Sequence, residues 1–424
     1  MLRKSFKAAS GWYYVSFPFD VTFGNIKVTS TQLTATTSSY KTATAPYKHF
    51  YVAEYNSARR DQTGNSISND SQNWDAVIAG TLSAKKGYAI RVMADIEIDF
   101  VGTANADMFD TASKNTTLEI NATNSSATHH NWNLVGLPYT SAFNLDNLSQ
   151  GTFYYVYNHT TQTFDVIQNG NAYKLNSFGA FFVQASDPAL TFNTAGRVLK
   201  APSSSKSSYD EIQLSLSNAG FSDITSIRLS DDGNLDYELD KDAAKILSLN
   251  DSTPQIWTNG QNCDLAINSL PTTIHEVALN TKTIKGTYSI ALNRPENITN
   301  TGKIILVDNC TGVQTDLLTE SSYTFDCSTG VTSNRFKIIF QNDLSTKIPA
   351  IVNGISVIVS GENLIVNGLS ESANIKLIDL TGRIVQTFEK VENNENLKMN
   401  PKQGIYLLHI QTATQESKLK ILCK

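Results

Sequence analysis

The sequence predicts an all-β protein in which several β-sandwich-like domains follow one another. Short segments rich in aromatic and β-branched residues recur along the chain, separated by Gly, Asn, Ser and Pro, as strands and turns are. Asn, Ser and Thr together outnumber the charged residues, which make up 17% of the chain, and such residues suit the solvated faces of sheets. At about 150 residues per domain, 424 residues provide for several domains.

Composition also bounds the function. The chain has 34 Lys and Arg against 39 Asp and Glu, for a net charge of −5, and no basic run, which argues against nucleic acid as a partner. No apolar run approaches the roughly 18 residues of a membrane-spanning helix. The cysteines, at 263, 310, 327 and 423, are too few for a disulfide framework. Cys310 and Cys327 flank a predicted β-meander, where one bridge and two small buried thiols are both open alternatives.

Four segments of the N-terminal region recur in the same order further along the chain. The matches are 11–19 with 131–139, 50–56 with 153–158, 87–92 with 179–184, and 98–102 with 190–194. This order predicts two related β-modules, residues 1–108 and 109–200, with Trp12 and Trp132 as their core anchors. The polar insertion at about 57–84 is interpreted as a loop.

Aromatic residues crowd the predicted strand at 153–158. Side chains alternate between the two faces of a strand, so one face is expected in the core and the other partly exposed. Tyr154, Tyr155 and Tyr157 are therefore candidate ligand-contact aromatics for a glycan. Ordinary cross-strand packing is the alternative.

Polar joints divide the rest of the chain. The Pro- and Ser-rich stretch 201–208 predicts a hinge. Short strand-like runs then predict a β-sandwich domain at 209–341, with one brief helical segment at 242–249. A second polar joint at 341–347 precedes a C-terminal domain at 350–424.

Motifs for catalysis or metal binding are few. The acidic stretch 231–240 fails the helix-loop-helix calcium pattern, because a loop beginning at Asp232 places Tyr237 at position six and Ala243 at position twelve. A looser calcium site and a solvated acidic turn remain as alternatives. The adjacent pair His129 and His130 makes a poor chelate. We predict no catalytic residue, metal or cofactor, although two carboxylates of a glycosidase leave no sequence pattern.

The C-terminal segment carries three motifs in order. Asp379 to Val385 reads Asp-Leu-Thr-Gly-Arg-Ile-Val, where Gly382 is expected at positive φ between two strands and Arg383 follows it. Gly404 to Ile410 contains Gly-Ile-Tyr406 and predicts another strand. A terminal lysine-bearing strand ends the chain, with Lys418, Lys420 and Lys424.

Together these motifs resemble the type A C-terminal sorting domain of the Bacteroidetes type IX secretion system, over about residues 351–424. The resemblance implies a small seven-stranded immunoglobulin-like β-sandwich, recognised by the outer-membrane machinery and usually cleaved off. It places the protein outside the cell or on the outer surface of a Gram-negative bacterium. The sequence departs from the family where Asn353-Gly354-Ile355 replaces an opening Asn-Pro pair. The segments 132–139, 180–184 and 323–338 are also similar to β-modules of surface proteins in these bacteria.

The sequence therefore predicts an exported, non-catalytic protein that acts as a stalk or adhesion-type binding module for glycans or host proteins. The alternative is an accessory region of a surface hydrolase whose catalytic domain lies upstream of Met1. Because the N-terminus shows no apolar signal-peptide segment, we expect the chain to be the C-terminal part of a longer polypeptide.

Overall fold

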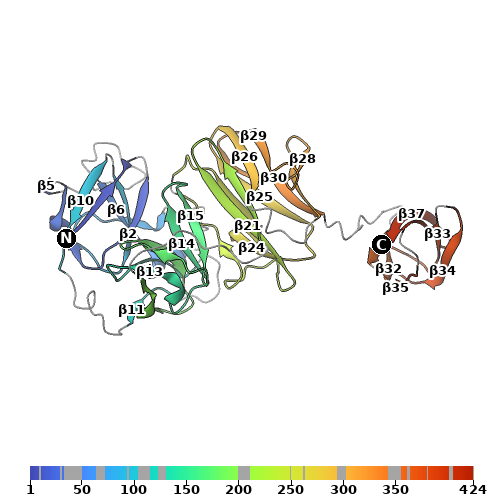
Figure 1. Cartoon of the computed structure of the whole chain (residues 1–424), viewed down its shortest axis with the longest axis horizontal. Coiled ribbons are helices and arrows are strands. Elements are labelled where there is room, and N and C mark those ends of the chain that lie inside the picture. Colours follow the sequence, from blue (N-terminus) through green and yellow to red (C-terminus); the bar gives the residue numbers. More distant parts are fainter. Residues whose placement is uncertain are drawn as a thin grey trace. The chain divides into compact units, whose positions relative to one another are not determined.

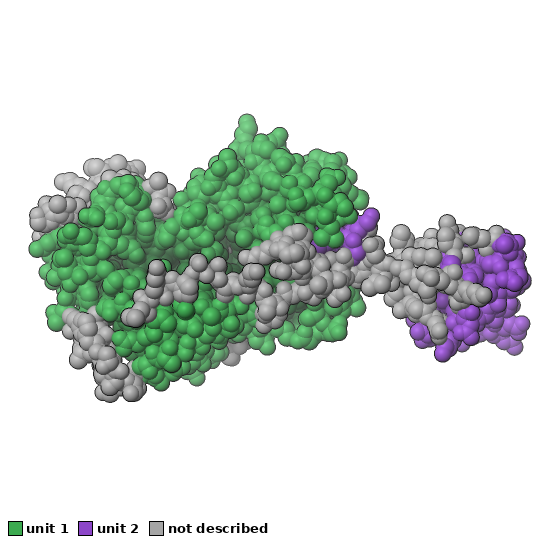
Figure 2. Space-filling model, in the orientation of Figure 1, with its two compact units in different colours: residues 1–299, 306–338 green, residues 300–305, 339–424 purple. Residues whose placement is uncertain are grey.

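The computed structural model describes residues 1–8, 11–28, 31–32, 50–63, 72–92, 95–103, 115–122, 130–198, 211–248, 250–260, 263–293, 302–341, 355–360, 363–379, 381–400 and 404–423. Strands dominate (Figure 1), which confirms the predicted all-β class. The chain divides into two compact units, residues 1–299 with 306–338 and residues 300–305 with 339–424 (Figure 2). The predicted joint at 201–208 lies outside the described residues, and so do residues 342–347 of the joint at 341–347 and residues 353–354 of the departure at 353–355.

Module 1 is built from two four-stranded sheets and one two-stranded sheet. Their orders are β1-β10-β4-β5, β2-β9-β6-β7 and β3-β8. Its elements are β1 (Leu2–Phe6), β2 (Trp12–Ser16), β3 (Val21–Thr22), η2 (Phe23–Asn25), β4 (Ile26–Val28), β5 (Thr31–Gln32), β6 (Phe50–Tyr55), α1 (Ser57–Thr63), β7 (Trp74–Ala76), β8 (Thr81–Leu82), β9 (Gly87–Val92) and β10 (Ile96–Phe100). The prediction of a plain loop at 57–84 is wrong, because α1, β7 and β8 lie within it.

Module 2 has the sheets β12-β17-β14-β15, β11-β18 and β16-β13-β19. Its elements are β11 (Thr116–Glu119), β12 (Trp132–Gly136), β13 (Ala142–Asn144), η5 (Leu145–Asn147), β14 (Phe153–Asn158), β15 (Thr163–Gln168), β16 (Lys174–Leu175), β17 (Ala180–Gln184), β18 (Ala189–Phe192), η6 (Thr194–Gly196) and β19 (Arg197–Val198). The central sheets of the two modules thus have equivalent orders, with β2, β9, β6 and β7 in the places of β12, β17, β14 and β15.

Strand register fixes which residues of the two modules correspond. Ser16 pairs with Gly87 in module 1, and Gly136 pairs with Ala180 in module 2. Gly87 therefore corresponds to Ala180, and the sequence match that set it opposite Gly179 is wrong by one residue. The segments 87–92 and 179–184 both begin with glycine, so the sequence alone aligns their glycines, whereas the strand register places Gly87 level with Ala180.

The two modules contact each other reciprocally. Isolated β-bridges join Val15 to Gly179 and, with the modules exchanged, Val135 to Lys86. The Ser16 N–H donates to the Phe178 carbonyl at 2.9 Å, and the Gly136 N–H donates to the Lys85 carbonyl at 3.0 Å. Both acceptor residues have positive φ, 65° for Phe178 and 68° for Lys85. Such an exchange of equivalent contacts is the pattern of an isologous interface, here within one chain.

The third β-region forms an eleven-stranded sheet over the described residues, in the order β28-β27-β30-β25-β23-β24-β21-β20-β26-β29, with β22 paired to β24. Its strands are β20 (Glu211–Ser217), β21 (Ser222–Ser230), β22 (Ala243–Ala244), β23 (Gln255–Gly260), β24 (Cys263–Pro271), β25 (Glu276–Thr283), β26 (Gly286–Asn293), β27 (Lys303–Asp308), β28 (Val313–Asp316), β29 (Ser322–Cys327) and β30 (Gly330–Gln341).

The prediction of a brief helix at 242–249 is wrong over its described residues, 242–248. The Asp242 carboxylate accepts the backbone N–H groups of Glu238, at 2.8 Å, and Ser269, at 2.7 Å. The buried Lys245 ammonium pairs with Asp223 at 2.5 Å. These non-local contacts hold the segment extended against β24, so tertiary packing overrides the local helical preference.

A shared core connects the two modules and the third β-region. Tyr14 of module 1 packs on Tyr157 of module 2, with ring centroids 4.9 Å apart. The Tyr237 hydroxyl of the third region donates to the Gln184 side chain at 2.6 Å. The predicted anchors Trp12 and Trp132 are both buried in this core. Other members are Tyr51, Tyr55, Trp74, Tyr155, Phe164, Phe182, Ala243, Ala244 and Leu265.

The C-terminal unit contains a compact domain with its own core. Two sheets, β31-β32-β35 and β34-β33-β36-β37, are formed by β31 (Ser356–Ser360), β32 (Asn363–Asn367), β33 (Ala373–Asp379), β34 (Ile384–Val391), β35 (Asn396–Lys398), β36 (Gly404–Gln411) and β37 (Glu416–Cys423). These are the seven strands that the sorting-domain resemblance implies. Buried residues of both sheets, among them Leu364, Ile375, Leu377, Leu408 and Ile410, form the core.

Candidate functional site

A cleft of about 680 Å³ lies where the two modules meet, and we call it the intermodule cleft. One wall comes from module 1, at the end of β6, the start of α1 and the turn before β9. The other comes from module 2, along β11 and β12. Hydroxyl, amide and charged groups line much of it, including Glu54, Ser57, Ser83, Lys86, Asn121 and Asn133. Its size is within the usual range of small-ligand sites, about 300–1,000 Å³.

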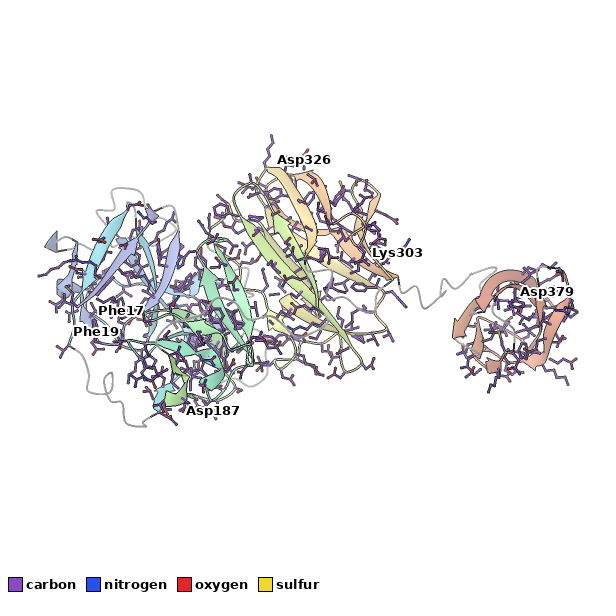
Figure 3. All side chains as sticks on the ribbon, in the orientation of Figure 1. Phe17, Phe19, Asp187, Lys303, Asp326 and Asp379 are labelled. Atoms are coloured by element: carbon purple, nitrogen blue, oxygen red, sulfur yellow. The ribbon has the colours of Figure 1, made fainter. Side chains whose placement is uncertain are left out.

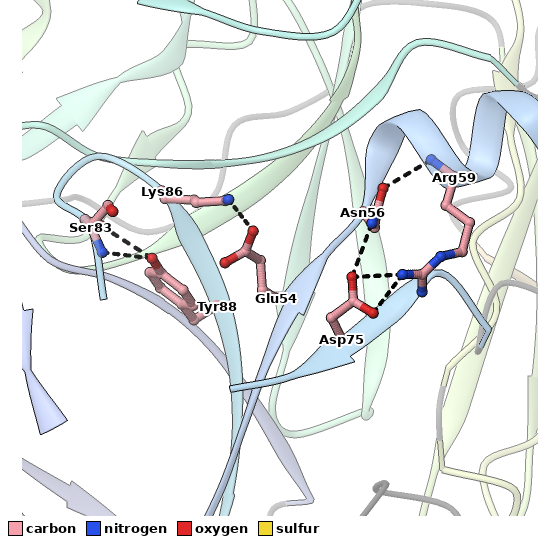
Figure 4. Close-up of polar contacts among 7 residues, drawn as sticks. All are labelled: Glu54, Asn56, Arg59, Asp75, Ser83, Lys86 and Tyr88. Carbon is pink, nitrogen blue, oxygen red and sulfur yellow. Dashed lines mark hydrogen bonds and ion pairs between the residues drawn. The ribbon is translucent and has the colours of Figure 1, made fainter. Parts of the chain in front are cut away.

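An ion pair marks the module 1 wall. The Lys86 ammonium contacts the Glu54 carboxylate (Figure 4), and the two side chains are 42% and 34% exposed. Glu54 lies on β6 and Lys86 lies in the turn before β9. Their side chains meet because these two strands are neighbours in one sheet. On the neighbouring strand, opposite Glu54, the Tyr88 hydroxyl accepts the Ser83 N–H at 2.7 Å. Burial, and next the Glu54 charge, raise the pKa of Tyr88 to about 12, so this phenol stays protonated.

A second polar cluster fixes the start of α1. The Asn56 side chain accepts the Arg59 N–H at 2.9 Å and donates to Asp75 at 2.9 Å (Figure 4). The Arg59 guanidinium contacts both Asp75 oxygens, at 2.6 and 2.8 Å. Partial burial raises the pKa of Asp75, but the hydrogen bonds from Asn56 and Arg59 outweigh it and hold that pKa below its usual value.

Amides organise the module 2 wall. The Asn133 side chain accepts the Asn121 N–H and donates to the Asn121 carbonyl, both at 2.8 Å. The Asn121 amide then donates to Ser57 at 2.9 Å and to Asp61 at 2.6 Å. These bonds tie β12 to the segment after β11 and to α1, so the wall is preorganised.

The tyrosines predicted to contact a ligand do not line this cleft as exposed groups. The side chains of Tyr154, Tyr155 and Tyr157 are 0%, 2% and 7% exposed. The prediction that one face of this strand is partly exposed is therefore wrong. Tyr154 lies in the core of module 2, and its hydroxyl donates to the Gln150 carbonyl at 3.0 Å. Tyr155 and Tyr157 face the other way, into the shared core. The face expected to be exposed is covered by the rest of the unit.

The other sequence candidates resolve as follows. In the acidic stretch, Asp232 and Glu238 both pair with Lys241, at 3.5 and 2.9 Å. Across the described part of the chain, no three His, Cys, Asp or Glu side chains gather as a metal site. Cys310 and Cys327 are free thiols, exposed and half-buried, so the alternative of a bridge between them is not realised.

Asp379 and residues 381–383 lie where β33 gives way to β34, and we call them the sorting turn (Asp379 is labelled in Figure 3). One Asp379 oxygen accepts the Thr381 hydroxyl at 2.6 Å and the N–H groups of Thr381 and Arg383, each at 3.0 Å. The Arg383 guanidinium contacts the other oxygen at 3.1 Å. The Thr381 hydroxyl bond and the other contacts lower the pKa of Asp379 to about 2. Gly382 has φ +86°, as predicted.

The remaining sorting residues lie on β36 and β37. Gly404 begins β36 opposite Cys423, and Tyr406 is buried in the domain core. Lys418 is exposed and pairs with Glu416 at 2.8 Å. Lys420 lies on β37 opposite Leu407, but its side chain is not among those described, and Lys424 lies outside the described residues.

The C-terminal domain, with its own two sheets and core, is the part of the chain for which a comparison identifies a family. Residues 359–424 match the family described as secretion system C-terminal sorting domain, which confirms the type IX resemblance. This domain indicates export to the cell surface or extracellular space. No curated protein matches the chain. In the part of the chain that the structure describes, every helix is too short or too polar to cross a membrane.

Proposed function

We propose that this chain is a non-catalytic binding protein of the cell surface, exported through its sorting domain, and that it holds a glycan in the intermodule cleft. The observation that carries the proposal is the cleft itself, which has the volume of a small-ligand site. Its lining of hydroxyls, amides and one partly exposed ion pair supplies the donors and acceptors that a polyhydroxylated ligand needs.

A glycan is favoured over a host protein by the shape and chemistry of this site. Protein partners usually bind broad surfaces with exposed aromatic anchors. Many aromatic side chains of the two modules instead lie in the shared core, while the cleft is concave and presents hydroxyl, amide and charged groups beside apolar ones such as Leu118 and Leu134. A sugar unit entering it replaces its own hydration with hydrogen bonds from a wall that is already ordered.

The test is a binding screen of the full chain against immobilised glycans, followed by titration of the strongest ligand. Lys86→Ala is expected to weaken binding at least tenfold. Lys337→Ala is the matched control, because Lys337 also pairs with a glutamate, Glu276 at 2.7 Å, but far along the sequence on β30. Failure of every glycan to bind would contradict the proposal, and binding of host proteins instead would favour the protein-ligand alternative.

A further inference from the structure

The reciprocal contact between the modules creates two equivalent places, of which the intermodule cleft is one. The other place, which we call the reciprocal region, has the modules exchanged. Its first wall is the part of module 2 that corresponds to the module 1 wall of the cleft, and its second wall is the corresponding part of module 1. Correspondence at the first wall follows from register, because Tyr55 pairs with Trp74 as Tyr157 pairs with Phe164. The next residues, Asn56 and Asn158, then correspond.

Side-chain hydrogen bonds confirm the correspondence at the second wall. In module 2 the Asn133 side chain contacts the backbone N–H and carbonyl of Asn121. In module 1 the Tyr13 hydroxyl accepts the Lys7 N–H at 2.7 Å and donates to the Lys7 carbonyl at 3.3 Å. Tyr13 therefore stands where Asn133 stands.

The two places differ in their charged groups. Glu54 precedes Tyr55, so its counterpart is Val156, which precedes Tyr157. Lys86 precedes Gly87, so its counterpart is Gly179, which precedes Ala180. The ion pair of the intermodule cleft thus has no charged counterpart in the reciprocal region.

The two places also differ in the size of the side chains at equivalent positions. Ser57 follows Asn56 at the cleft, whereas His159 follows Asn158 in the reciprocal region. The His159 ring lies 4.5 Å from the Tyr13 ring and 5.3 Å from the Tyr157 ring, between centroids. Rings therefore pack where the cleft has Ser57 and Asn133.

From this difference we propose that the Glu54–Lys86 pair recognises two neighbouring hydroxyls of a sugar, and that each chain binds one such ligand. The inference rests on the proposed function and specifies its contacts. A carboxylate beside an ammonium offers an acceptor and a donor side by side. One hydroxyl of a vicinal pair donates to Glu54, and the oxygen of the other accepts from Lys86. Hydrogen bonds to charged groups are roughly twice as strong as neutral ones.

The experiment follows the backbone amides of the isotope-labelled full chain by NMR during titration with methyl glycopyranosides and their monodeoxy analogues. We expect saturable shifts at residues 54 and 85–87, none at 156 and 178–180, and one ligand per chain. Removing either hydroxyl of the recognised pair from the sugar is expected to weaken binding at least tenfold.

Two variants make the assignment specific. E54V/K86G gives the cleft the side chains of the reciprocal region and is expected to lose at least tenfold in affinity and to stop discriminating the deoxy sugars. E54Q, which preserves shape, keeps the test valid should the double variant unfold, and it is expected to lose most of the hydroxyl discrimination. H159S, the matched control in the reciprocal region, is expected to bind as the unmodified chain does.

The outcomes separate the inference from the proposed function. The inference is overturned if sugars bind elsewhere or in both places. It is also overturned if E54V/K86G and E54Q bind sugar at the cleft as well as the unmodified chain does. These outcomes leave glycan binding itself standing. Absence of binding by any sugar or glycan overturns both.

Discussion

Gly382 and Asp379 shape the sorting turn in different ways. Asp379 supplies acceptors for the turn's N–H groups, whereas Gly382 supplies a backbone conformation at φ +86° that other residues adopt only with strain. Open space surrounds the position a Cβ would take at Gly382, so a larger side chain meets no steric obstacle there.

Gly382→Ala is therefore expected to destabilise the C-terminal domain by about 1 kcal/mol, from backbone strain alone. Chemical denaturation of the full chain, followed by fluorine NMR of a fluorotyrosine incorporated only at position 406, measures this loss. Gly404→Ala is the matched control, because Gly404 lies in a strand and a Cβ there meets only ordinary contacts with Tyr406. An equal or larger loss in the control would contradict the strain argument.

Arg60 is a fully buried cation within unit 1. Its guanidinium donates to the Tyr55 hydroxyl at 2.6 Å and lies 5.2 Å from the centre of the Trp132 ring, so one side chain of module 1 contacts the core anchor of module 2. Arg60→Met is expected to leave the Tyr55 hydroxyl without this partner and to cost about 1–3 kcal/mol in stability. Thermal unfolding measures the change. Arg59→Met, one residue earlier and partly exposed, is expected to cost less than half as much, and the reverse order would contradict this reading.

At the scale of elements, the two modules use one Asn–Asp arrangement with opposite electrostatic results. Asn56 and Asp75 correspond to Asn158 and Asp165, whose side chains contact at 3.1 Å. Module 1 adds Arg59, which helps to hold the pKa of Asp75 below its usual value. For Asp165, burial, with a smaller contribution from Asp223, raises the pKa to about 6.

These opposite shifts predict opposite pH dependences. Asp165 titrates near 4 when unfolded and about 6 when folded, so its contribution favours folding at low pH and declines as pH rises from about 4 to 6. The effect of Asp165→Asn on the free energy of unfolding is expected to be more favourable at pH 7.5 than at pH 4.5, by an amount on the order of 2 kcal/mol. Asp75→Asn is expected to destabilise it at pH 7.5, because its lowered pKa stabilises the fold above about pH 4. Melting curves of both variants at the two pH values check the signs, and a shared sign would contradict the assignment.

Local signals predicted the strands well and their surroundings poorly. Trp12, Trp132 and the alternating aromatic segments are read directly from the sequence, and so is the positive φ of Gly382. The second face of β14 could not be predicted, because what buries Tyr155 and Tyr157 lies in other parts of unit 1. Helix α1 was missed because its seven residues carry little apolar periodicity.

The intermodule cleft was missed for a related reason. Glu54 and Lys86 are 32 residues apart and meet only because β6 and β9 pair in one sheet. One sequence signal does mark Glu54: where the modules are aligned, it corresponds to the apolar Val156. A charge in one copy and an apolar residue in the other, on otherwise equivalent strands, indicates a position freed from core packing.

At the scale of the whole molecule, the chain combines a large unit with a shared core and a small domain that is an export address. The C-terminal domain has its own two sheets and core, so it forms a complete fold without strands from the modules. Its sorting turn presents Arg383 in solvent, with the side chain 79% exposed. The export address and the proposed binding cleft therefore belong to different compact units of the chain.

Deleting residues 359–424 is accordingly expected to abolish export and to leave the cleft intact. In cells of a type IX-secreting bacterium, protease treatment of intact cells followed by mass spectrometry of the released peptides measures the display of residues 1–341. With the same added N-terminal signal peptide on both, the full-length chain is expected to yield these peptides, and the truncated chain to yield at least tenfold fewer, with the protein retained inside. The glycan affinity of the purified truncated chain is expected to equal that of the full chain, because the residues that line the cleft belong to the two modules and not to the deleted segment. Surface peptides at undiminished level from the truncated chain would contradict the assignment of the address, and a lost affinity would contradict the separation of the two surfaces.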